Sequence, residues 1–119
     1  MARLKTEQSA KMVWSVLSKQ DFIQAGANED ELPDVIEELI KNTPNAEVVV
    51  LLYEDRDKNV CGIVSSGRGL DSLELALPFK PQGTRDVARI FFKDTSILDA
   101  EKTVIPKLIE RVKVRQSKP

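Results

Sequence analysis

Two apolar runs separated by a short charged segment constrain the fold of this chain most strongly. Residues 48–54 read Val-Val-Val-Leu-Leu-Tyr-Glu, and residues 60–66 read Val-Cys-Gly-Ile-Val-Ser-Ser. Runs of this length that are rich in β-branched residues are typical of strands covered on both faces. The segment between them, 55–59, is charged and polar, which suits a hairpin turn. The sequence therefore predicts a buried antiparallel pair, with 48–54 near the centre of a sheet.

Two segments precede this pair. Residues 11–18 are rich in β-formers and are interpreted as a strand, although a helix is an open alternative on pattern alone. Asn28 and Glu31 then resemble a capping box. Apolar residues follow at helical spacing as far as Ile40, and acidic residues crowd the first turn, where the helix dipole favours them. An acidic helix is therefore expected before the first buried strand.

Three segments follow the pair. Asp71 and Glu74 predict a cap for a short helix over 72–77, and residues 87–92 read as a further strand. A last helix is expected to begin at Ser96, with Pro106 removing one of its backbone hydrogen bonds. Its apolar face is predicted to consist of Ala100, Val104, Ile105, Leu108, Ile109 and Val112. Cys61, Trp14 and the pair Phe91 and Phe92 are expected to be core residues.

The resulting order is β-α-β-β-α-β-α. It predicts a single α/β (α+β) domain, in which a mixed sheet of four to five strands is covered by helices. The domain is expected to span residues 11–113. Residues 1–10 are expected to be disordered or a linker, and residues 114–119 a basic, solvated tail.

Composition excludes several kinds of chemistry. The chain has 119 residues, a net charge of −1, no histidine and one cysteine. Without histidine there is no imidazole for zinc binding, for acid–base catalysis or for activating a serine or cysteine nucleophile. The near-neutral charge gives no bulk attraction for nucleic acid. The sequence shows no signal peptide or membrane span, so we expect a cytoplasmic protein with no cofactor in this chain.

Two loops between Cys61 and Phe92 carry the chemistry that suits a bound anion. The first spans residues 62–69 and leads into the short helix, and the second spans 79–86. Each combines glycine, a hydroxyl group and arginine, and such loops can turn backbone N–H groups and a guanidinium toward phosphate. Plain turns are the alternative. The candidate phosphate or substrate contacts are Ser65, Ser66, Arg68, Gly83, Thr84 and Arg85.

The order of elements and several local motifs resemble the C-terminal DHHA1 domain of the DHH phosphoesterases, especially the oligoribonuclease and pAp phosphatase group. The matching passages are Leu17-Ser18-Lys19-Gln20-Asp21-Phe22 with Gly26-Ala27, Gly62-Ile63-Val64-Ser65-Ser66, Leu70-Asp71 with Ala76, Phe79 to Arg89, and Ser96-Ile97-Leu98-Asp99-Ala100-Glu101. The resemblance extends from about Lys11 to Val112. It implies a domain that helps to hold a substrate phosphate or nucleotide. Divalent metal, such as manganese, is expected only in a separate N-terminal DHH domain.

The chain departs from the family pattern where relatives contact substrate. The signature arginine is replaced by Ser65, and the histidine of the glycine-rich motif is replaced by Thr84. Three signature glycines are Lys80, Pro81 and Gln82, whereas Gly83 is retained. Arg68 and Arg85 could supply the missing charge, because guanidinium groups pair bidentately with phosphate.

Three functions follow as hypotheses. The first is the substrate-binding domain of a DHH-type phosphoesterase, which binds a nucleotide, a nucleic-acid end or a phosphorylated small molecule. The alternative is a protein-interaction or oligomerisation module that has lost phosphate binding and associates through a sheet edge or a helix face. The least favoured is an independent phosphoesterase, because two-metal phosphoryl chemistry needs clustered carboxylates that the sequence does not show.

Overall fold

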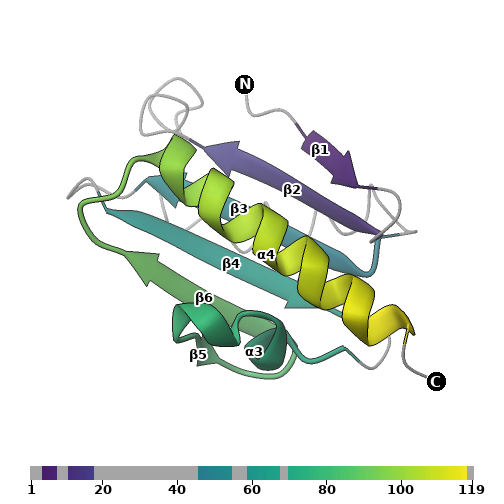
Figure 1. The fold of residues 1–119 in the computed structure, drawn as a ribbon. Coiled ribbons are helices and arrows are strands. Elements are labelled where there is room, and N and C mark those ends of the chain that lie inside the picture. Colours follow the sequence, from purple (N-terminus) through teal and green to yellow (C-terminus); the bar gives the residue numbers. More distant parts are fainter. Residues whose placement is uncertain (1–3, 8–10, 18–45, 55–58, 68–69, 118–119) are drawn as a thin grey trace.

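The described part of the chain forms one mixed sheet of six strands, in the order β1-β2-β3-β4-β6-β5. The computed structural model describes residues 4–7, 11–17, 46–54, 59–67 and 70–117. Helix α4 runs across one face of the sheet, and α3 lies on the same side beside β6 (Figure 1). β2 and β3 are parallel, and the other neighbouring strands are antiparallel. The predicted fold class, a mixed sheet with helices packed on it, is confirmed.

The elements have the following bounds. The strands are β1 (Leu4–Glu7), β2 (Met12–Leu17), β3 (Val48–Glu54), β4 (Val60–Ser66), β5 (Gln82–Gly83) and β6 (Val87–Phe92). The helices are α3 (Ser72–Leu75), the 3-10 helix η3 (Leu77–Phe79) and α4 (Ile97–Ser117). Within these described residues, no helix is both long enough and apolar enough to cross a membrane.

The buried hairpin is confirmed. β3 lies between β2 and β4, and Tyr53 pairs with Cys61 in the antiparallel ladder. Residues 12–17, within the segment for which a helix is an open alternative, form strand β2. Because β2 and β3 are parallel, a crossover must connect their ends. The acidic helix predicted in that connection falls within 18–45, outside the described residues, as does the turn at 55–58.

Two expectations were wrong at the ends of the domain. Residues 4–7 were expected to be disordered or a linker, but they form β1. Their sequence, Leu-Lys-Thr-Glu, has no apolar periodicity, and their order comes from pairing with β2. Likewise, α4 continues to Ser117, beyond the start of the expected basic tail at residue 114. With β1 and the two-residue β5, the described sheet has more strands than the four to five expected.

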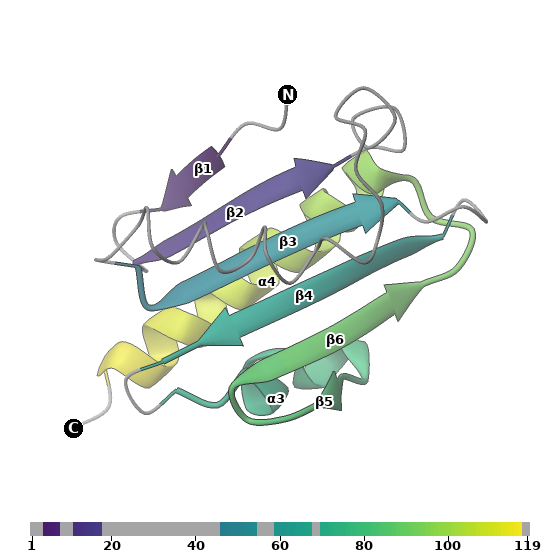
Figure 2. The same cartoon turned by 180° about the vertical axis from the view of Figure 1, so that it is seen from behind.

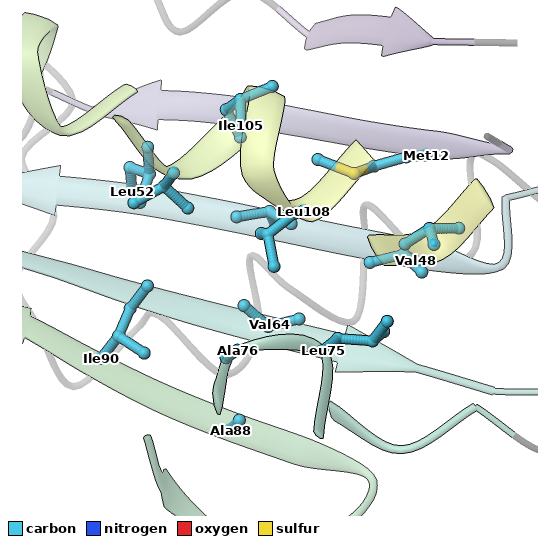
Figure 3. Packing of buried hydrophobic residues seen from close by; sticks show 13 residues of the cluster. Met12, Val48, Leu52, Val64, Leu75, Ala76, Ala88, Ile90, Ile105 and Leu108 are labelled. Atoms are coloured by element: carbon cyan, nitrogen blue, oxygen red, sulfur yellow. The ribbon is translucent and has the colours of Figure 1, made fainter. Parts of the chain in front are cut away.

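The main core lies between the sheet and α4. Met12, Leu52, Ile90 and Leu108 are fully buried there and come from three strands and the helix (Figure 3). Burial of such side chains stabilises a fold by about 1.5–3 kcal/mol each. Gly62 lies at the centre of this face, and an added Cβ would come within 2.7 Å of Ile90 Cγ1. Glycine therefore lets the side chains of β3 and β6 approach one another over β4.

The opposite face of the sheet carries a second, smaller cluster. Leu51, Tyr53, Cys61 and Ile63 are buried on β3 and β4. Figure 2 views the sheet from this side, with α4 behind it. Cys61 is thus a core residue, as expected. Phe91 on β6 is not, because 53% of its surface is exposed.

The helix caps follow the sequence predictions. Asp71 Oδ1 accepts hydrogen bonds from the backbone N–H groups of Leu73 at 3.0 Å and Glu74 at 3.3 Å. Ser96 Oγ accepts one from the Asp99 N–H at 3.1 Å. The predicted apolar face of the last helix packs into the core, and α4 is continuous through Pro106. Local polar signals therefore set where these helices begin.

A cluster that we call the β1–α4 clasp joins the first strand to the last helix. Glu101 Oε2 accepts hydrogen bonds from Lys5 Nζ at 2.6 Å and from the Trp14 indole N–H at 2.9 Å. Burial raises the pKa of Glu101, but the hydrogen bonds from Lys5 and Trp14 and the Lys5 charge outweigh it, so the pKa lies below its ordinary value. The clasp therefore holds an ionised carboxylate over the edge of the sheet.

Candidate functional site

The structure brings the two candidate loops together at one end of the sheet. Ser65 at the end of β4 pairs with Val87 at the start of β6. The Ser66 N–H donates to the Asp86 carbonyl at 3.1 Å, and the Ser72 N–H donates to the Arg85 carbonyl at 2.7 Å. The end of β4, the start of α3 and the turn before β6 are therefore joined by backbone hydrogen bonds.

Two serine hydroxyls reinforce this junction, and we call Ser66, Ser72 and the Asp86 carbonyl the serine network. The two Oγ atoms are 2.6 Å apart, Ser72 Oγ lies 3.0 Å from the Asp86 carbonyl oxygen, and Ser66 Oγ lies 3.3 Å from the Leu70 carbonyl oxygen. Two hydroxyls have only two protons for these three contacts. The two shorter contacts are satisfied when Ser66 donates to Ser72 and Ser72 donates to Asp86.

Ser72 is a residue that the sequence analysis missed. It is fully buried, although it directly follows the helix cap Asp71. Buried hydroxyls almost always have hydrogen-bond partners, and here those partners connect both candidate loops. A serine at the first helical position is too common to signal such a role, so only the tertiary structure reveals it.

Helix α3 is held in place from the other side by α4. Arg111 Nη2 donates to the carbonyl of Glu74 at 2.8 Å, near the end of α3. Arg111 thereby adds a hydrogen bond from α4 to a carbonyl at the end of α3, where helix carbonyls commonly use partners outside the helix. Because α3 carries Ser72, this contact also positions the serine network relative to the core.

A tight turn precedes β6. The Thr84 N–H donates to the Val87 carbonyl at 2.8 Å, and the Val87 N–H donates to Thr84 Oγ1 at 3.2 Å. Gly83 has φ +123°, and an added Cβ would lie 2.5 Å from the Val87 carbonyl oxygen. Only glycine fits this position without strain, so the one retained glycine of the family signature is required by the turn itself.

The candidate contacts differ in how available they are to a ligand. Arg85 and Thr84 lie on the exposed turn, where Thr84 Oγ1 already contacts the N–H and the carbonyl of Val87, and Ser65 is half-buried at the end of β4. The Ser66 hydroxyl is bonded inside the protein. Arg68 lies outside the described residues, so the structure does not place its guanidinium relative to Arg85.

The described part of the junction offers hydrogen-bond donors and positive charge but no cluster of metal ligands. Among the described residues, no group of three or more His, Cys, Asp or Glu side chains could hold a metal ion. Exposed Lys80 and Arg85 contribute cations near the turn, and Asp86 contributes one carboxylate. This composition suits recognition of an anion.

Comparison with known proteins shows what this fold is similar to. No family model and no curated protein matches the sequence. Among solved structures, an exopolyphosphatase-related protein from Bacteroides fragilis matches with a TM-score of 0.81 and 14% identity, over 98% of this chain and 33% of that one. A pGpG-specific phosphodiesterase from Vibrio cholerae matches with a TM-score of 0.63 and 15% identity, over 93% of this chain and 35% of that one.

These matches concern the fold, because both identities are low. The chain spans about one third of the length of the two solved structures. Their names agree with the resemblance to the DHH phosphoesterases drawn from the motifs. The fold of this chain is therefore similar to that of about one third of each of these two proteins.

Proposed function

We propose that this chain is the substrate-binding domain of a DHH-type phosphoesterase and has no catalytic metal site of its own. Its ligand is a nucleotide, a nucleic-acid end or a phosphorylated small molecule. The observation that supports this most directly is the junction of the β4 end with the turn before β6. These are the positions where the family it resembles contacts substrate.

The proposed contacts are unequal in role. Arg85 supplies the positive charge for the phosphate, Thr84 adjoins it in the turn, and Ser65 lies opposite Val87 at the end of β4. Gly83 shapes the turn that presents Arg85 and Thr84. Ser66 acts through the serine network as a positioning residue, because its hydroxyl proton is used within the protein.

Replacement of the histidine and the glycines of the family motif weakens phosphate binding but leaves the position of the binding site unchanged. Pro81 removes a backbone N–H, and the Thr84 N–H is already bonded to Val87. Side chains, above all Arg85, must therefore provide most of the binding. This predicts modest affinity for phosphate alone, and tighter binding when the rest of a larger ligand adds contacts.

The test is an NMR titration of the isotope-labelled chain with pGpG, with adenosine 3′,5′-bisphosphate and with inorganic phosphate. We expect the amide signals of residues 65–66 and 83–87 to shift with saturation, and Arg85→Ala to weaken binding by about tenfold, the loss of one charge-assisted hydrogen bond. Lys107→Ala, which removes an exposed charge from α4, is the matched control and should leave binding unchanged.

Two results would contradict the proposal. One is that none of the three compounds shifts the signals of 65–66 or 83–87 at millimolar concentration. The other is saturable binding that Arg85→Ala and Lys107→Ala reduce equally, since this would indicate general charge attraction. Hydrolysis of pGpG by the purified chain with added manganese would favour the independent enzyme instead.

A further inference from the structure

We propose that this chain forms a two-fold symmetric dimer through the outer edge of β1, with Thr6 of one copy opposite Thr6 of the other. β1 ends the sheet on one side (Figure 1), and no described strand lies beyond it. The N–H and C=O groups along such an edge can pair with another strand. This proposal does not depend on ligand binding at the other end of the sheet.

Hydrogen bonds of β2 show which groups of β1 face outward. The Lys11 carbonyl accepts from the Val48 N–H at 3.3 Å, so it points toward β3. The N–H of Met12 belongs to the same planar peptide group and therefore points the other way, toward β1. Met12 lies opposite Glu7 in the antiparallel register. Met12 and Glu7 thus form a hydrogen-bonded pair.

Alternation then fixes the rest of β1. Residues two apart in a strand direct their backbone groups to the same side. Lys5 is two residues from Glu7 and lies opposite Trp14, so its backbone groups also face β2. Thr6 lies between them and directs its N–H and C=O to the free edge. A second Thr6 placed opposite would exchange two hydrogen bonds with it.

The charges of β1 match this arrangement. Pairing about Thr6 sets Lys5 of each copy directly opposite Glu7 of the other. Lys5 and the facing Glu7 occupy a non-hydrogen-bonded position of the antiparallel ladder, where the side chains of opposite residues approach most closely. Both side chains lie on the α4 side, because Lys5 reaches Glu101 there and Glu7 is two residues along. Each interface therefore contains two symmetric opposite-charge pairs.

The β1–α4 clasp prepares Lys5 for this contact. A lysine on an edge strand ordinarily discourages pairing with other chains. Here Lys5 is drawn toward Glu101, and 49% of its side chain remains exposed beside the edge. It can therefore contact a carboxylate of the second copy while it keeps its own partner.

The opposite edge of the sheet lacks this complementarity. β5 already pairs with Ala88 and Arg89 of β6, and β6 has an open edge only toward Phe91. Antiparallel pairing of two copies about Phe91 would set Arg89 opposite Lys93, and like charges directly opposite are destabilising. Self-association is thus favoured at β1 and disfavoured at β6.

The helices leave room for the dimer. α4 contacts β2 and β3 on the sheet. Two such helices related by an axis at the edge of β1 are separated by at least three strand spacings, or roughly 14 Å. Packed helices lie about 8–10 Å apart, so the two copies of α4 do not collide.

The test uses sedimentation equilibrium of the purified chain over a wide range of concentration. We expect a monomer–dimer equilibrium. Thr6→Pro should abolish the dimer, because proline removes the outward N–H and leaves the β1–β2 hydrogen bonds intact. Thr6→Val keeps the N–H and is the matched control, with a dimer as stable as the parent's.

Glu7→Lys provides a second variant in case Thr6→Pro disturbs β1. It sets lysine opposite lysine twice and should raise the dissociation constant of the dimer by about tenfold. This difference from the parent chain should be smaller at high salt, which screens the repulsion. A chain that stays monomeric at all concentrations would overturn the proposal. A dimer of unchanged affinity in both Thr6→Pro and Glu7→Lys would place the interface elsewhere and would also overturn it.

Discussion

The serine network and the β1–α4 clasp both join distant parts of the chain, but they do so with different chemistry. The network joins the β4 end, α3 and the turn before β6 through neutral hydroxyl, amide and carbonyl groups. The clasp joins β1, β2 and α4 through one carboxylate, one ammonium and an indole N–H. The first depends on close geometry, and the second depends on charge. The proposed ligand site is built on the first kind of junction, and the proposed dimer edge on the second.

The largest effect is expected for Gly83→Ala, which attacks the geometry beside the network. The positive φ and the 2.5 Å approach to the Val87 carbonyl oxygen leave no space for a methyl group. We expect a loss of about 3 kcal/mol in the free energy of unfolding, the upper range for strained backbone. Urea denaturation measures this loss.

Gly67→Ala is the control for that experiment. An added Cβ at Gly67 meets no atom within 4 Å, so its effect should stay within about 0.5 kcal/mol. Equal losses for the two variants would show that the turn before β6 is not the constrained element that the structure indicates.

Ser72→Ala should have an intermediate effect. It removes a fully buried hydroxyl and its bonds to Ser66 and Asp86. We expect a loss of about 1–2 kcal/mol, with little dependence on pH because no group of the network is charged. Denaturation at acid and neutral pH tests both points. Thr103→Ala, on the exposed side of α4, serves as the control. A loss of unfolding free energy near zero for Ser72→Ala would mean that backbone hydrogen bonds alone hold the two loops together.

Glu101→Gln should have the smallest effect at neutral pH and the clearest pH dependence. It removes the charge but leaves an acceptor for Trp14, and the exposure of Lys5 limits the loss to about 1 kcal/mol. The folded pKa of Glu101 is lowered from its ordinary 4.5. The carboxylate therefore contributes its stability fully above the unfolded pKa, and this is lost as pH falls through the folded pKa.

Parallel denaturation curves of the parent and Glu101→Gln check this prediction. The difference between them should shrink as the solution is made acidic, whereas the deficit of Ser72→Ala should remain. A parent–variant difference that grows in acid would reverse the sign and would show that burial, not the Lys5 and Trp14 bonds, controls Glu101.

Much of the fold could be predicted because its signals are local. The apolar runs of β3 and β4, the caps at Asp71 and Ser96 and the apolar face of α4 depend on residues close in sequence. β1 could not be predicted, since Leu4-Lys5-Thr6-Glu7 acquires its order from β2 and from Glu101, almost a hundred residues away. Exposed Phe91 shows the same limit, because its position at the edge of the sheet decides its burial.

The candidate site was predicted in part for the same reason. Glycine, arginine and hydroxyl-bearing residues identified the two loops from the sequence. Gly83 could be identified because it is the retained glycine of a local sequence motif. That the loops meet, and that Ser72 joins them from a separate helix, depends on pairing between β4 and β6. The role of Arg85 in ligand binding stays a prediction, as do those of Ser65, Ser66, Gly83, Thr84 and Arg68.

By itself, the sequence determined the fold class of this protein, with a buried central hairpin and helices with defined starts. It also determined that no histidine is present for catalysis. These properties are fixed by side-chain chemistry and spacing along the chain. Only the tertiary structure decided which polar groups work together. Hydrogen bonds and ion pairs act over a few ångströms, and folding alone brings Ser66 to Ser72 and Lys5 to Glu101.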